Sequence, residues 1–94
     1  GGPAAPTGLT ASGTRYSGYG AVILNWNASS GATRYYVYMG TSPNGESSPP
    51  LGYVTSPGAE VTGLSQYAKY YFKVKAYDSA GYSAYSNEAS ATTR

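Results

Sequence analysis

Four carboxylates are the only acidic side chains with which this 94-residue chain could do acid–base chemistry: Glu46, Glu60, Asp78 and Glu88. The sequence has no His and no Cys, which excludes Ser-His-Asp and Cys-His catalysis and the common zinc sites. A glycosidase needs two carboxyls that face each other across a cleft. Because the four carboxylates fall in predicted turns or on the outer sides of predicted strands, we expect no catalytic centre, no metal site and no cofactor.

Tyrosine is the second kind of side chain with chemistry to offer, since the chain contains 12 of them. A Tyr ring can stack on a sugar ring while its hydroxyl and neighbouring lysines hydrogen-bond to the sugar. Alternation along 35–39 and 70–77 places one set of side chains on the outer face of a predicted sheet, where they form a candidate binding face: Tyr36, Tyr38, Tyr71, Lys73, Lys75 and Tyr77. The alternative interpretation is structural, because cross-strand aromatic pairs also stabilise a sheet.

The remaining tyrosines do not define a second site in the sequence. Tyr16, Tyr19, Tyr82 and Tyr85 are spread over predicted turns and loops, where Tyr82 could be an exposed contact.

The longest two-residue alternation of the chain predicts a central strand over 70–77. Tyr70, Phe72, Val74 and Ala76 fall on its inner side. Leu64 precedes Tyr70 by six residues, a spacing typical of a tyrosine corner, in which the ring enters the core and the hydroxyl bonds to the backbone near Leu64. Leu64, Tyr70 and Trp26, the best candidate for the centre of the core, are therefore assigned structural roles.

Shorter alternations separated by turn residues predict six further strands, near 9–12, 21–27, 35–39, 51–55, 60–62 and 86–92. No helical period accompanies them, so the class is all-β. We expect a long turn over 12–20, a second turn at Asn44-Gly45, and a type II turn at Pro57-Gly58 in which Gly58 has a positive φ. Residues 1–5 are expected to be a linker or frayed terminus, and 6–94 a single domain.

The amino-acid composition limits the kinds of partner that this chain can bind. Charged residues make up only 11% of the chain and its net charge of +2 is scattered along it, so nucleic-acid binding gets no support. No apolar run is long enough for membrane insertion or a signal peptide, and any export signal is expected outside this sequence. We expect a monomer. Asn27-Ala28-Ser29 matches an N-glycosylation acceptor in a predicted loop.

In their order and spacing, several short motifs resemble a fibronectin type III domain. They are Pro6-x-x-Leu9-x-Ala11, Leu24-x-Trp26, Tyr35-x-Val37, Gly63-Leu64, Tyr70-x-Phe72-x-Val74-x-Ala76 and Ser86-Asn87 to Ala91-Thr92-Thr93. The chain departs from the family at Gln66 and Ala68, where a Pro and a small polar residue are common. The resemblance implies an immunoglobulin-like β-sandwich of seven antiparallel strands without intrinsic catalysis. One sheet would contain 9–12, 21–27 and 60–62, and the other 51–55, 35–39, 70–77 and 86–92.

The functional prediction also rests on resemblance. The loop DSAGYSAYS lacks the Arg-Gly-Asp of the animal cell-adhesion members, so integrin binding by that route is not supported. Endings such as AYDSAG and SATT resemble modules of bacterial secreted polysaccharide-degrading enzymes. This implies a non-catalytic spacer in a larger secreted carbohydrate-active protein, with neighbouring domains of the same polypeptide as partners. The alternative is a module that binds a polysaccharide or a protein through the tyrosine face or the polar loops, and a third interpretation is an engineered binding scaffold.

Overall fold

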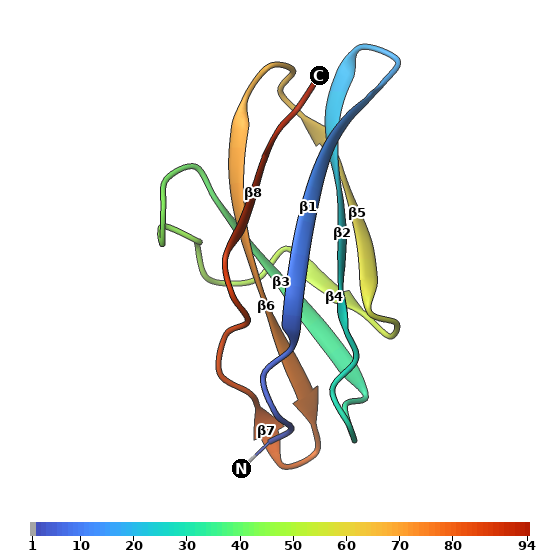
Figure 1. Cartoon of the computed structure of the whole chain (residues 1–94), viewed down its shortest axis with the longest axis vertical. Helices are drawn as coiled ribbons and strands as arrows, with labels where there is room; N and C mark the ends of the chain where they lie inside the picture. The colour runs from blue at the N-terminus through green and yellow to red at the C-terminus, as the bar shows by residue number, and fades with distance from the viewer. Residues whose placement is uncertain (1) are drawn as a thin grey trace.

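The computed structural model describes residues 2–94, which form two antiparallel sheets (Figure 1). Within these residues the strands are β1 (Thr7–Tyr16), β2 (Tyr19–Asn27), β3 (Arg34–Gly40), β4 (Gly52–Val54), β5 (Gly58–Leu64), β6 (Lys69–Asp78), β7 (Gly81–Tyr82) and β8 (Ala89–Thr92). One sheet has the order β1-β2-β5, and the other β4-β3-β6, with β7 and β8 both paired to the free edge of β6. The predicted division of the strands between two sheets is confirmed. Residues 2–94 contain no helix with the length and apolar character needed to cross a membrane.

Alternating side chains of both sheets meet in one core. Leu24 and Val22 of β2 and Phe72 and Val74 of β6 are fully shielded from solvent, as the predicted parity of both strands requires. Burying each of these side chains stabilises the fold by about 1.5–3 kcal/mol relative to exposure. Trp26 is buried too, and its ring meets Tyr35 edge-on at 5.5 Å. The largest fully shielded side chains are nevertheless these three aliphatic residues and Phe72, rather than Trp26.

The predicted tyrosine corner is present. Tyr70 is buried, and its hydroxyl accepts a hydrogen bond of 3.1 Å from the backbone N–H of Ser65, the residue after Leu64. Thr93 secures the same turn, since its hydroxyl donates to the carbonyl of Ser65 at 2.6 Å and its N–H donates to the carbonyl of Ala68 at 2.8 Å. The corner therefore ties the start of β6 to the C-terminal end of the chain.

Only the second half of the last predicted strand, 86–92, is a strand, namely β8, and β7 is a separate short strand before it. Two serines take over the ladder positions between β7 and β8. The backbone N–H of Ala76 donates to Ser83 Oγ at 2.8 Å, and that of Val74 donates to Ser86 Oγ at 2.9 Å. The N–H groups of both serines donate in return to the carbonyls of Ala76 and Val74, at 2.8 Å each. The edge of β6 thus stays satisfied although no strand runs along it here. Ala89 and Ala91 on β8 pack against the core, as predicted.

The long turn predicted over 12–20 is wrong. β1 and β2 pair as far as Tyr16 and Tyr19, which leaves a two-residue turn at Ser17-Gly18 in which Gly18 has φ 82°. The glycine at position 13 serves close packing instead, because a Cβ there would collide with the carbonyl of Thr92.

Of the other two predicted turns, one is confirmed and one is wrong. At Asn44-Gly45 the Gly45 N–H donates to the carbonyl of Ser42 at 3.0 Å, which confirms the turn. The type II turn at Pro57-Gly58 is wrong: Gly58 does not have a positive φ, and its N–H donates to Ser56 at 2.9 Å in a three-residue turn.

The molecule is elongated, with principal extents of 40 × 22 × 21 Å, and its two ends lie at opposite poles (Figure 1). Residues 2–6 precede β1 without regular structure and Gly1 lies outside the described residues, so the domain boundary near residue 6 stays a prediction.

We expect Tyr70→Phe to lower the free energy of unfolding by about 1–2 kcal/mol, because the Ser65 N–H loses its acceptor while the ring stays in place. Urea denaturation measures the change. Tyr67→Phe is the matched control, since Tyr67 is 75% exposed and should lose nothing. Equal midpoints for Tyr70→Phe and the unmodified chain would show that the corner bond contributes no stability.

We expect Ser86→Ala to cost about 1–3 kcal/mol, because the N–H of Val74 is left buried without an acceptor. The exposed Ser90 on β8 provides the control, as Ser90→Ala removes a hydroxyl of the same kind from a solvated position. Faster amide hydrogen exchange at Val74 in the first variant and not in the second would locate the effect. If both variants unfold at the same denaturant concentration, the hydroxyl does not replace a ladder bond.

Candidate functional site

The six residues predicted to form a binding face lie on the outer side of the sheet formed by β3 and β6. Their register pairs Tyr36 with Lys75, Tyr38 with Lys73, and Arg34 with Tyr77 across the two strands. Tyr71 lies opposite Gly40 at the far end of the ladder. The predicted parity is therefore correct for the whole set, and the differences arise in what covers each side chain.

Tyr36 is the centre of a cluster to which three other strands contribute. Its ring lies 5.6 Å from Tyr53 of β4, 5.7 Å from Tyr77 of β6 and 5.2 Å from Tyr82 of β7, measured between ring centres. The Arg34 guanidinium lies 4.5 Å from the centre of the Tyr53 ring and donates to the Tyr36 hydroxyl at 3.2 Å. Edge and tilted contacts of this kind contribute about 0.5–1.5 kcal/mol each beyond area burial.

Tyr38 belongs to a second cluster and is not available to a partner. Tyr85 meets it edge-on at 5.2 Å, and the Lys75 ammonium lies 5.6 Å from its ring centre. Tyr38 is consequently only 6% exposed, so the expectation of an exposed Tyr38 is wrong. The chain that leaves β7 carries Tyr85 over this position. Burial also raises the pKa of the Tyr38 hydroxyl, which stays protonated at neutral pH.

Three tyrosines that the sequence did not assign to this face are its most exposed aromatic residues. Tyr53 and Tyr82 are each 52% exposed and Tyr85 is 41% exposed. Together they complete what we call the aromatic layer, which consists of Tyr36, Tyr38, Tyr53, Tyr77, Tyr82 and Tyr85. The alternation of side chains in the predicted strand 51–55 was a usable signal for Tyr53. Tyr82 lies on β7 opposite Tyr77, and the position of Tyr85 depends on the serine-bonded path after β7.

The rings of the aromatic layer do not form a flat row. Contacting planes are inclined to one another by 49° to 86°. A ligand would therefore meet separate ring faces and edges instead of one continuous stacking surface.

Tyr71 stands apart from the aromatic layer, whereas Lys73 lies at its margin with its ammonium 5.3 Å from the Tyr85 ring centre. The Lys69 ammonium lies 5.4 Å from the Tyr71 ring centre, at the far end of the β3–β6 ladder. Lys73 donates to Asn44 Oδ1 at 2.9 Å and lies 3.8 Å from the Glu46 carboxylate. The charge of Lys73 is therefore compensated within the protein.

Two of the four carboxylates come together beside Lys73. Glu46 has a side chain that is 3% exposed, and burial is the main cause that raises its pKa, with the neighbouring Glu88 adding to the rise. The hydrogen bond from Glu46 lowers the pKa of Glu88, whose carboxylate also accepts from the N–H of Asn44 at 2.7 Å. The pair fastens the loop after β3 to the segment before β8.

The other two carboxylates are engaged locally. Glu60 accepts a hydrogen bond from the Tyr16 hydroxyl, and Asp78 accepts one from the Ala80 N–H at 2.8 Å as the first residue of a turn. Within residues 2–94, no three of the His, Cys, Asp and Glu side chains gather to hold a metal ion.

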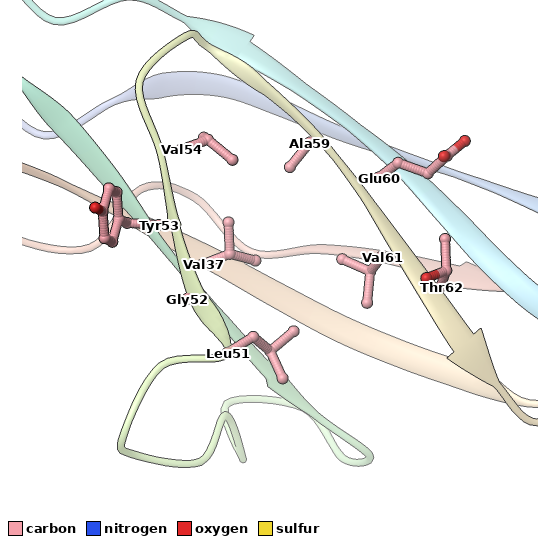
Figure 2. A pocket seen from close by; sticks show the side chains of 9 residues that line it. All are labelled: Val37, Leu51, Gly52, Tyr53, Val54, Ala59, Glu60, Val61 and Thr62. Atoms are coloured by element: carbon pink, nitrogen blue, oxygen red, sulfur yellow. The ribbon is translucent and has the colours of Figure 1, made fainter.

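A groove of about 310 Å³ opens between β4 and β5, where the two sheets part (Figure 2). Its walls are mostly aliphatic and come from both sheets: Val37, Leu51, Val54, Ala59 and Val61. The one carboxylate at its rim, Glu60, is already bonded to Tyr16. The groove offers an apolar surface and no paired acid and base.

Two antiparallel sheets in this order, locked by a tyrosine corner, define an immunoglobulin-like β-sandwich. Residues 4–92 match the model of the fibronectin type III domain, and the chain belongs to this family. No curated protein matches the chain.

Solved structures extend the comparison. A Fn3-like protein from Clostridium thermocellum is 33% identical, with a TM-score of 0.83 over 98% of this chain and 94% of that one. A domain of human fibronectin type III domain containing protein 3 is 29% identical, with a TM-score of 0.74 over 99% and 87%. A β-1,2-glucanase from Parabacteroides distasonis shares the fold, at 22% identity and a TM-score of 0.81, over 97% of this chain and 12% of that chain. Domains of this fold thus occur as small, generally non-catalytic parts of larger proteins.

We expect Glu46→Gln to stabilise the protein at pH 7. Because the pKa of Glu46 is raised in the folded protein, the folded state favours the protonated carboxyl. The stability that protonated Glu46 contributes is therefore present at low pH and is lost as the pH rises through the raised pKa. Gln keeps the neutral form and a donor for Glu88. The gain in the urea midpoint should be largest near pH 7 and should vanish below about pH 4. A difference that is the same at every pH would contradict this assignment.

Proposed function

We propose that this fibronectin type III domain is a non-catalytic spacer that holds neighbouring domains of one polypeptide at a fixed separation. The observation that carries the proposal is the 40 Å body with its two chain ends at opposite poles (Figure 1). A domain of this shape can be inserted into a chain end to end, and it adds its own length between its neighbours.

Both poles hold the chain firmly, which a spacer requires. Near the N-terminal pole, the N–H and carbonyl of Leu9 bond to the side-chain amide of Asn87 at 2.9 and 3.0 Å. Near the C-terminal pole, Thr93 is bonded into the tyrosine corner, and the Arg94 N–H donates to the Thr14 carbonyl at 3.3 Å. A flanking domain would therefore be attached to ordered backbone with little slack.

We further propose that the parent protein is secreted, bacterial and carbohydrate-active, and that the domain acts in it as a monomer. The resemblance of the AYDSAG and SATT segments to modules of such enzymes supports this context. So does the likeness to a Clostridium thermocellum protein, together with the occurrence of the fold inside a β-1,2-glucanase. The neighbouring domains of the same polypeptide are the partners of this function.

The spacer proposal is tested in the parent protein by replacing residues 6–94. An unrelated rigid domain of similar length between its termini should preserve activity on an insoluble polysaccharide, whereas a Gly/Ser linker should lower it, because a flexible chain does not fix the separation. Activity on a soluble oligosaccharide serves as the control and should not change in either variant. If the flexible linker supports full activity on the insoluble substrate, the domain is not needed as a rigid spacer.

The second candidate function is binding through the aromatic layer. It is favoured by one specific observation: Tyr82 and Tyr85 are exposed beside a cation, Lys75, that has no acidic partner within residues 2–94.

A further inference from the structure

Lys75 is held by aromatic rings rather than by a carboxylate. Its ammonium lies 4.4 Å from the ring centre of Tyr85, 5.6 Å from that of Tyr38 and 5.9 Å from that of Tyr82. Within residues 2–94 it takes part in no ion pair, in contrast to Lys73, which has Glu46. Three rings thus orient a positive charge whose hydrogen-bonding capacity is left to solvent or to a ligand.

Arg34 provides a second uncompensated cation on the same face. It stacks on Tyr53 and donates one hydrogen bond to the Tyr36 hydroxyl, and no carboxylate pairs with it among residues 2–94. Because Tyr36 is opposite Lys75 and Arg34 is two residues before Tyr36, Arg34 and Lys75 occupy diagonal positions about 7–8 Å apart at the backbone. Tyr82, which contacts the Tyr36 ring and is approached by Lys75, links the two cations.

The exposed rings next to these cations are suited to sugars. Tyr82 and Tyr85 are 52% and 41% exposed, and the Lys75 ammonium lies 5.9 Å and 4.4 Å from their respective ring centres. The apolar face of a pyranose ring can pack on one Tyr ring. A carboxylate on the edge of the same sugar would then reach the ammonium and form a charge-assisted hydrogen bond. The tilt between rings suits single sugar units on separate rings, with the charges at intervals along the polymer.

We propose that Tyr82, Tyr85, Lys75 and Arg34 form a binding site for an acidic polysaccharide whose sugar units carry carboxylates. The two exposed rings pack against the sugars, and the two cations select for the carboxylates. The site gives the domain a function beyond spacing, because it would hold the parent protein on a uronate-containing polymer.

Polygalacturonate is a suitable probe, and its fully methyl-esterified form is the matched neutral polymer. We expect the isolated domain to bind polygalacturonate in isothermal titration at low ionic strength and to bind the ester at least about tenfold more weakly, since each ester removes a charge-assisted bond. Binding should also weaken as salt is added. No binding of polygalacturonate, or equal binding of both polymers, would overturn the proposal.

Lys75→Gln and Lys69→Gln form a matched pair of variants. Each removes one positive charge from the same strand, but Lys69 lies over Tyr71 and away from Tyr82 and Tyr85. We expect Lys75→Gln to weaken binding by about tenfold and Lys69→Gln to weaken it by less than about twofold. Equal losses would mean that net charge alone attracts the polymer, and would overturn the site.

Two further measurements keep the proposal testable if Lys75→Gln lowers stability. Arg34→Gln alters an exposed side chain, and it should weaken binding while the thermal unfolding midpoint stays within a few degrees of the unmodified chain. A poly-glutamate peptide of equal charge should bind more weakly than polygalacturonate because it has no sugar face for the rings. If the peptide binds equally well, the partner is an acidic peptide and the glycan assignment is wrong.

Discussion

Burial of Phe72 between the two sheets fixes the directions in which the remaining side chains of β6 point. Side chains alternate along a strand, so a shift of the register by one residue would exchange the core face for the outer face. With Phe72 and Val74 fully shielded, Lys73, Lys75 and Tyr77 must face outward. The composition of the outer face is therefore set by the same packing that holds the sandwich together, and it cannot change independently of the core.

Much of the sandwich could be predicted from the sequence because its signals are local. The alternation of 70–77 and the six-residue interval between Leu64 and Tyr70 depend on neighbours in the chain, and the structure confirms both. The start of the last predicted strand and the 12–20 turn were wrong for a different reason. Their geometry depends on contacts across the fold: hydroxyls of Ser83 and Ser86 that substitute for ladder acceptors, and the close approach of Thr92 to residue 13.

The alternation of side chains along each strand predicted which residues of the candidate site share a face, but not which other segments cover them. Parity placed Tyr36, Tyr77 and Lys75 on one face, and they meet there. It could not reveal that Tyr85 covers Tyr38, because that contact follows from the irregular path after β7. Nor could it reveal that Tyr82 joins the layer, because the short strand β7 was not predicted. The exposed part of the face is thus supplied by segments with weak sequence signals, and the buried part by segments with strong ones.

The anchoring of the two ends in different sheets has a mechanical consequence. The chain enters through β1, which pairs with β2, and leaves through β8, which pairs with β6. A pull on the opposite poles (Figure 1) acts along these strands, while their ladder bonds run across them. The bonds of each ladder are then loaded in shear and must break together instead of opening one by one.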